Sequence, residues 1–416
     1  MKSIFKKIIS SILIFESKLV LKKYKPTVIS VTGSVGKTST KDAIFTVLSD
    51  IRHIRKSEKS FNSEIGLPLT ILGCQNGWNN PFIWLKNIFI GLELIFLKTK
   101  YSECLVLEIG ADHPGDISGL TSWLKSDIVV ITKVSDIPVH VEFFNSPDDV
   151  FIEKFSLVKS LKKDGVLIIS ADDKRLMDAS KEVKNRVMTF GIDNLANINA
   201  SNIEFDINKG VSFKLNYENN SIPILLKNII GNQQVYPIIS AIAVGIVKNV
   251  SISRMIELIS NHIPPRGRMN LIKGINGSII IDDSYNSSPD ALHEALMALS
   301  KARVSGKKIA VLGDMMELGK YSSEEHKKAG NLALSSCDLL LTLGPRAKLM
   351  SDKAFNFDSI SDISAYLKDM ISIADVILVK GSQSMRMERI VKNLLSEECN
   401  AKDLLVRQES EWLAKK

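Results

Sequence analysis

Short apolar runs alternate with longer amphipathic stretches along most of this chain. The runs with the strongest strand character lie at 28–32, 105–109, 128–132 and 166–170, and segments of helical periodicity separate them. Strands that alternate with helices are typical of a mostly parallel sheet with helices on both faces. Residues 198–226 instead alternate polar and apolar positions and predict an antiparallel patch, before a helix at 235–247.

One proline-rich segment, Pro264-Pro265-Arg266-Gly267, interrupts this alternation. Proline cannot continue a helix or a central strand, so the segment is predicted to be a linker. Beyond it the pattern restarts, with strands at 278–282, 308–312, 339–343 and 376–379 and a helix at 291–299. The chain is therefore predicted to be an α/β protein with two domains, the second of Rossmann-like character.

Residues 1–25 have a different pattern, that of an amphipathic helix with a basic face. The segment has no small-residue cleavage site, which argues against a signal peptide. Two interpretations stay open: a helix docked on the domain that follows, or a helix in peripheral contact with the inner face of a membrane. A second apolar stretch, 81–97, is interrupted by Lys86 and Glu93 and is predicted to be a buried or interfacial helix.

Composition adds a few limits to this picture. The chain has 416 residues and a net charge of +8, but its lysines are dispersed and no arginine-rich arm appears, so no nucleic-acid partner is expected. The four cysteines form no C-x-x-C pair, which predicts neither a zinc site nor disulfides and fits a cytoplasmic protein.

A phosphate-binding loop is the clearest chemical motif. Gly33-Ser34-Val35-Gly36-Lys37-Thr38-Ser39 follows a predicted strand and opens a predicted helix, as a shortened form of G-x-x-x-x-G-K-[ST]. Backbone N–H groups of such a loop bind phosphate oxygens at the positive end of the helix dipole. Lys37 is predicted to reach the β- and γ-phosphates of ATP, and the Thr38 hydroxyl to bind Mg²⁺.

Six ordered motifs extend this loop over some 350 residues. They are T-G-S-V-G-K-T-S-T at 32–40, F-N-S-E-I-G-L-P-L-T at 61–70, L-E-I-G-A-D-H-P-G-D-I at 107–117, D-D-S-Y-N-S-S-P-D at 282–290, G-D-M-M-E-L-G at 313–319 and V-K-G-S at 379–382. With these motifs the chain resembles the Mur ligase family. After the amphipathic basic helix predicted at 1–25, the resemblance implies a central P-loop ATPase domain with a mostly parallel sheet at 26–264 and a C-terminal Rossmann-like domain at 265–416.

The resemblance also implies roles for residues of the central domain. Glu108, at a predicted strand end, would bind Mg²⁺, and His140 would bind a second Mg²⁺ unless it is a surface-loop histidine. Lys154 would become a carbamate that serves as an anionic ligand, with Lys159 as a rival and an ordinary exposed lysine as the alternative. Two departures, Lys133 in place of asparagine and Ser156 in place of glutamate, weaken the match around His140 and Lys154.

Further implied contacts fall on the nucleotide and the acceptor. For ATP they are Gln234, in place of an asparagine that reads adenine, Arg268 for phosphate, Asp283 for the ribose, and Asn286, which with Tyr285 would cover the nucleotide. For the substrate they are Asn62, Thr70, His113, Lys380 and Ser382, of which Asn62 and Thr70 could equally be turn caps and His113 structural. Arg386 could meet a carboxylate or be a solvated charge on a helix.

The implied function is an ATP- and Mg²⁺-dependent ligase that joins a carboxylate to an amine through an acyl-phosphate. The motifs favour the branch that adds D-alanyl-D-alanine to a muramoyl-peptide precursor in peptidoglycan synthesis, and hence a role in cell shape and division. Alternatives are a ligase on another acid, of the cyanophycin or poly-γ-glutamate type, or a non-catalytic ATP-binding partner at the membrane. Family members carry a UDP-binding domain before the phosphate loop, whereas this chain reaches Gly33 after one predicted helix, so the donor acid stays open.

Overall fold

The computed structural model describes residues 2–51, 53–58, 64–78 and 80–414, with side chains from residue 7 onward. The chain folds into two compact units, and each is described by itself. Unit 1 comprises 1–134, 148–199 and 236–262, and unit 2 comprises 135–147, 200–235 and 263–416. No helix of the described chain is long and apolar enough to cross a membrane.

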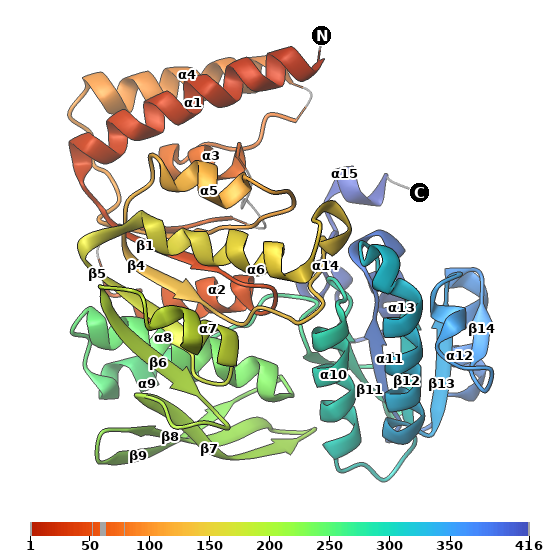
Figure 1. Cartoon of the computed structure of the whole chain (residues 1–416). Coiled ribbons are helices and arrows are strands. Elements are labelled where there is room, and N and C mark those ends of the chain that lie inside the picture. Colours follow the sequence, from red (N-terminus) through yellow and green to blue (C-terminus); the bar gives the residue numbers. More distant parts are fainter. Residues whose placement is uncertain (1, 52, 59–63, 79, 415–416) are drawn as a thin grey trace. The chain divides into compact units, whose positions relative to one another are not determined.

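Unit 1 is built on a parallel sheet of strand order β2-β3-β1-β4-β5-β6-β7 (Figure 1). The strands are β1 (Thr27–Thr32), β2 (Ile54–Lys56), β3 (Cys104–Glu108), β4 (Ser126–Ile131), β5 (Leu161–Ser170), β6 (Arg186–Gly191) and the first residues of β7 (Ile198–Asp206). The four predicted strands match β1, β3, β4 and β5, because a fully buried parallel strand is a nearly uninterrupted apolar run.

Helices cover this sheet on both faces, as predicted. They are α1 (Lys2–Tyr24), α2 (Lys37–Val47), α3 (Gly66–Leu72), α4 (Pro81–Phe96), α5 (Asp116–Thr121), α6 (Pro147–Phe155), α7 (Lys174–Ser180), α8 (Val235–Val247) and α9 (Ile252–Ser260), with a 3-10 turn at Ser156–Ser160. Figure 1 shows α1 and α4 side by side as an outer pair, with α3 between them and the sheet. Ile9, Leu13 and Val20 of α1 enter the same apolar core as Trp84 and Leu94 of α4.

The two outer helices are also joined by polar contacts at their C-terminal ends. Lys23 Nζ donates hydrogen bonds to the carbonyl oxygens of Leu94 (2.9 Å) and Ile95 (3.0 Å) and to that of Leu97, and the Tyr24 hydroxyl donates to Leu94 O (3.0 Å). These carbonyl groups end α4 and have no partner within their own helix. One face of α1 is therefore packed on the rest of unit 1.

Unit 2 contains the rest of β7, the antiparallel hairpin β8 (Gly210–Tyr217) and β9 (Asn220–Leu226), and a six-stranded sheet of order β10-β11-β15-β12-β13-β14. The hairpin matches the antiparallel patch predicted at 198–226. The sheet strands are β10 (Asn270–Lys273), β11 (Ile279–Asp283), β12 (Lys308–Gly313), β13 (Leu339–Leu343), β14 (Phe355–Phe357) and β15 (Val376–Lys380). All pairs are parallel except β10 with β11.

Alternate residues of these strands enter different cores, because side chains of a strand point to opposite faces. Ala310 and Leu312 of β12 pack toward α10 (Pro289–Lys301) and α11 (Ser322–Ser336), whereas Ile309 and Val311 pack toward α12 (Ile360–Met370) and α13 (Glu388–Asn393). Short elements complete the unit: α14 (Ala401–Leu404), α15 (Ser410–Leu413) and 3-10 turns at Val141–Phe143, Asn232–Gln234, Ile275–Gly277, Gly319–Tyr321, Ala347–Leu349 and Gln383–Met385. The predicted α/β class with two sheets is confirmed.

Candidate active site

The phosphate loop joins β1 to α2 in unit 1, as its sequence predicts. Gly36, the N-cap of α2, has φ 84°, and Gly33 has φ 144°, both in the region that favours glycine. A Cβ on Gly33 would lie 2.0 Å from Thr132 Oγ1, so no larger residue fits there. Lys37 Nζ donates to Gly33 O at 2.9 Å and lies folded over the loop.

Glu108 lies beside the loop at the end of β3. Its Oε1 accepts a hydrogen bond from the Thr38 hydroxyl at 3.1 Å, while its buried Oε2 receives no hydrogen bond within the described chain. The nearest ammonium to Oε2 is that of Lys41, at 3.9 Å. A buried carboxylate oxygen costs free energy unless a cation or donor compensates it, and carboxylate and hydroxyl oxygens are suitable Mg²⁺ ligands. The two predicted ligands, Thr38 and Glu108, therefore meet in a site that fits the cation.

Lys41 and Ser57 support this arrangement and were not predicted from the sequence. Lys41 is 2% exposed and donates to Ser57 O at 2.8 Å, and the backbone N–H of Glu108 donates to Ser57 Oγ at 3.1 Å. Lys41 follows Lys37 by four residues on α2, and residues four apart lie on the same face of a helix. This spacing is the one sequence signal that could have suggested a role for Lys41.

Lys154 lies in the last turn of α6 and is 2% exposed. Burial lowers the pKa of its ammonium to about 7, and the positive charge of Lys37 lowers it further, against the opposing effect of Asp112, Glu153 and Asp116. A large part of the Lys154 population is thus a neutral amine near neutral pH. Lys159, the rival, is exposed in the following 3-10 turn.

Glu153, next to Lys154, is a further residue that the sequence did not reveal, after Lys41 and Ser57. Its Oε1 accepts from the backbone N–H groups of Ile117 (2.6 Å) and Ser118 (2.9 Å), which fixes α6 to the start of α5. In the first residue of α5, Asp116 Oδ2 accepts from the N–H groups of Asp112 and His113, so the loop that carries the exposed His113 is ordered.

Two other predicted substrate residues of unit 1 have different outcomes. Thr70 is buried within α3 rather than in a loop, and its hydroxyl donates to Gly66 O at 3.0 Å, a contact within the helix. Asn62 lies outside the described residues.

In unit 2 the structure brings Asp283, Asn286, Lys380 and Ser382 together at the carboxyl ends of β11 and β15. Lys380 Nζ is 2.6 Å from Asp283 Oδ2 and donates to Asn286 O at 2.8 Å, and its side chain is 2% exposed. Ser382 Oγ accepts from the N–H of Met316 at 2.8 Å. The carboxyl ends of parallel strands are where α/β folds bind ligands.

Gln234 and Arg268 form a second group in unit 2. Gln234 Nε2 donates to Arg268 O at 2.7 Å, and the Arg268 guanidinium lies 4.2 Å from the centre of the Tyr285 ring. These residues, predicted separately as nucleotide contacts, are therefore neighbours. His326 of α11 is buried and accepts from Met315 N at 3.0 Å through Nε2, so it orders the 313–319 loop.

His140 also belongs to unit 2, where its Nδ1 lies 2.7 Å from Glu317 Oε2. Its φ of 71° places the backbone in the left-handed region, just before a 3-10 turn. Within the described chain, no three His, Cys, Asp or Glu side chains gather as a metal site. The second-metal role of His140 stays a prediction.

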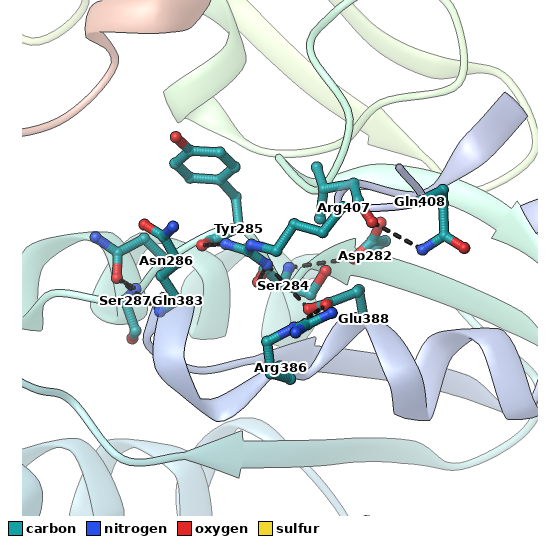
Figure 2. A network of polar contacts seen from close by, with 11 residues as sticks. Asp282, Ser284, Tyr285, Asn286, Ser287, Gln383, Arg386, Glu388, Arg407 and Gln408 are labelled. Atoms are coloured by element: carbon teal, nitrogen blue, oxygen red, sulfur yellow. Dashed lines mark hydrogen bonds and ion pairs between the residues drawn. The ribbon is translucent and has the colours of Figure 1, made fainter. Parts of the chain in front are cut away.

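Of the two alternatives for Arg386, a contact with a carboxylate or a solvated charge on a helix, the structure excludes the second. It is 7% exposed, precedes α13 with φ 54°, and its Nε donates to Glu388 Oε1 at 2.7 Å. Figure 2 shows Glu388 between Arg386 and Arg407, whose Nη1 donates to Glu388 Oε2 at 2.9 Å. Sequence spacing could not reveal Arg407, because it comes from a separate segment after α14.

Comparisons with known proteins agree with this geometry. The family model described as the Mur ligase middle domain matches residues 86–245, and that of the Mur ligase glutamate ligase domain matches 267–383. The UDP-N-acetylmuramoyl-tripeptide–D-alanyl-D-alanine ligase of Bacillus subtilis is 30% identical over 391 residues, 91% of this chain and 78% of that protein. The corresponding Escherichia coli ligase is 26% identical over 375 residues, 88% of this chain and 76% of that protein.

Among solved structures, MurF ligase from Thermotoga maritima in complex with ADP aligns with a TM-score of 0.80 and 26% identity, covering 92% of this chain and 83% of that chain. MurF from Acinetobacter baumannii, at 23% identity and a TM-score of 0.77, supports the fold alone, over 93% of this chain and 79% of that chain. The phosphate loop with its Thr38–Glu108 contact lies within a chain that aligns with these relatives over most of its length. The chain belongs to the Mur ligase family.

Proposed function

We propose that this Mur ligase uses ATP to join D-alanyl-D-alanine to a UDP-muramoyl tripeptide in peptidoglycan synthesis. The contact between Thr38 and Glu108 beside the phosphate loop carries the proposal, because it leaves a buried carboxylate oxygen where a divalent cation would compensate it. The names of the aligned relatives support the choice of substrates.

The reaction has two steps. A carboxylate oxygen of the tripeptide attacks the γ-phosphorus of ATP, the bond from that phosphorus to ADP breaks, and an acyl-phosphate forms. The amine of D-alanyl-D-alanine then attacks the acyl carbon, phosphate leaves, and the amine loses a proton as the amide forms. The first step brings two anions together, so it depends on cations held near the transferred phosphoryl group.

Residues of unit 1 supply this charge. The loop N–H groups and the Lys37 ammonium bind the phosphates, and Thr38 and Glu108 would hold Mg²⁺, whose charge offsets that of the transferred phosphoryl group. The buried, partly neutral amine of Lys154 can react with carbon dioxide to give a carbamate, an anion suited to a second cation or to the substrate amine. In unit 2, Asp283 and Asn286 are proposed for the ribose side, and Gln234 and Arg268 for the base and phosphate.

Phosphate release by the purified full chain tests the proposal. The assay contains ATP, Mg²⁺, muramoyl tripeptide and D-alanyl-D-alanine, with each omitted in turn, and poly-glutamate or poly-aspartate as alternative acids. We expect turnover only with the complete set, and a loss of roughly 10²–10³-fold in Lys37→Ala and in Glu108→Gln. Lys163→Ala, a change of an exposed lysine to which no site role is assigned, is the matched control and keeps full activity.

Two results would contradict the proposal. Full phosphate release in the absence of the tripeptide or of D-alanyl-D-alanine would identify an ATPase rather than a ligase. Turnover with poly-glutamate or poly-aspartate, but not with the tripeptide, would place the enzyme in another branch of the family.

A further inference from the structure

A stripe of exposed apolar side chains runs along α4. Phe82, Leu85, Phe89, Leu92 and Phe96 are 78%, 52%, 61%, 38% and 79% exposed. Their spacing of three and four residues places them on one face of the helix. The buried residues of α4, Trp84, Asn87, Gly91 and Leu94, have the same spacing and occupy the opposite face. The stripe is therefore a continuous apolar surface that the fold does not use.

The neighbouring helix α1 adds to this surface. Ile8 and Phe15 are 54% and 61% exposed, on the side of α1 opposite its buried Leu13 and Val20. Figure 1 shows that α1 and α4 lie side by side as the outer pair of helices. Because both helices bury their other faces in the same core, their exposed faces lie on the same side of unit 1. We call the seven side chains Ile8, Phe15, Phe82, Leu85, Phe89, Leu92 and Phe96 the apolar face.

Positive charge surrounds the apolar face. The exposed lysines of the two helices and of the segments that follow them are Lys7, Lys18, Lys22, Lys23, Lys25, Lys86, Lys98 and Lys100. Of the acids on the described parts of these helices, Glu16 is buried and Glu93 is exposed. Lys18 and Lys22 continue the exposed side of α1 beyond Phe15, at helical spacing. An apolar helical face bordered by lysines is the pattern of helices that lie in the headgroup region of anionic membranes.

The hydrogen bonds at the end of α4 suit the same environment. Carbonyl groups without partners are costly in an apolar medium, and here Lys23 and Tyr24 supply donors to those of Leu94, Ile95 and Leu97. Since α4 is too short and is packed on one side, it would lie on the surface and not cross it.

We propose that the apolar face of α1 and α4 binds the surface of an anionic lipid bilayer and holds the enzyme there. The proposal does not depend on the ligase reaction. Aromatic and leucine side chains would enter the headgroup boundary, and the flanking lysines would contact anionic headgroups.

Vesicle flotation of the full chain tests this. We expect the protein to float with vesicles that contain phosphatidylglycerol and less with pure phosphatidylcholine. Increasing salt should weaken its binding to the phosphatidylglycerol vesicles, because salt screens the attraction between lysines and anionic headgroups. Phe89→Ser with Phe96→Ser should weaken binding by about tenfold per aromatic side chain, because each loses its buried apolar area. Lys18→Glu with Lys22→Glu should weaken binding to anionic vesicles alone.

The matched control is the double variant Leu195→Ser and Ile373→Ser, which makes the same change at side chains 98% and 78% exposed elsewhere. It should float like the wild type, and thermal unfolding should show that all variants are folded. Flotation of the Phe89/Phe96 variant equal to that of the wild type would overturn the proposal. So would a lipid-free dimer, seen by light scattering, that the same variant dissociates, because a second copy would then cover the apolar face.

Discussion

Asp283 and Lys380 form a buried ion pair at the carboxyl ends of β11 and β15. Each was predicted as a ligand contact on its own, from separate motifs. The structure pairs β11 with β15 in a register that sets Asp283 opposite Lys380, so the two form a buried ion pair. Strand order is a tertiary property, and no pattern within either motif contains it. The residues were identified, whereas their contact was not.

Removing one partner of this pair should destabilise unit 2. We expect Lys380→Met to lower the free energy of unfolding by about 3 kcal/mol, because the Asp283 carboxylate would stay buried without its cation. The double variant Lys380→Met with Asp283→Asn should recover most of this loss. Urea unfolding of the wild type, the single variant and the double variant measures these free energies. An equal loss of unfolding free energy in both variants would show that Asp283 and Lys380 do not stabilise the fold as a pair.

The Lys154 amine allows a direct measurement of carbamate formation. With ¹³C-bicarbonate, the folded protein should show a carbamate ¹³C signal that rises as pH increases through about 7, because the neutral amine is the reactive form. Lys154→Arg should abolish the signal, and Lys159→Arg should retain it. A signal that follows Lys159 instead would assign the modification to the rival lysine.

At the scale of elements, long buried strands and helices were predictable and short ones were not. β1, β3, β4 and the 235–247 helix were predicted within two residues, because their apolar runs are uninterrupted. β2 and β14 have three residues each and little burial, so no pattern marks them. The contact of α1 with α4 also escaped prediction, since it depends on a glycine: a Cβ on Gly91 would lie 2.2 Å from Glu16 Oε2.

Glu16 makes this helix contact sensitive to pH. Burial raises the pKa of Glu16 to about 7, above the 4.5 of an unperturbed glutamate, and neither carboxylate oxygen has a hydrogen-bond partner within the described chain. The folded state therefore disfavours the charge. The free energy of unfolding is therefore highest below pH 4.5, where Glu16 is protonated in both the folded and the unfolded chain. It falls by up to about 3 kcal/mol as the pH rises to about 7.

Glu16→Gln should remove this dependence. We expect the variant to unfold at a higher temperature than the wild type at pH 8 and at the same temperature at pH 4.5. Glu93→Gln, on the exposed side of α4, is the control and should change neither value. If the unfolding temperatures of the Glu16→Gln variant and the wild type changed with pH in the same way, the Glu16 carboxylate would not be the cause of the pH dependence.

At the scale of the molecule, the chain passes between its two units at 134/135, 147/148, 199/200, 235/236 and 262/263. The sequence predicted a single boundary, at 264/265, between the central and C-terminal domains of the family. That boundary stays a prediction. A sequence pattern shows only local periodicity. It could not predict that residues 135–147 and 200–235 pack with residues 263–416. Ile137, Phe205 and Ile207 from those segments lie against the core formed by α10, α11 and the unit 2 sheet.

This threading affects how the protein can be made. On the ribosome, unit 1 is complete once His262 has emerged, but the segments that carry Ile137 and Phe205 must then wait for the remaining residues. At translation speeds of about 5–20 residues per second, the 154 residues after His262 take roughly 8–30 s to synthesise, and these apolar side chains stay uncovered for that time. The nascent chain thus presents binding sites for chaperones through the second half of its synthesis.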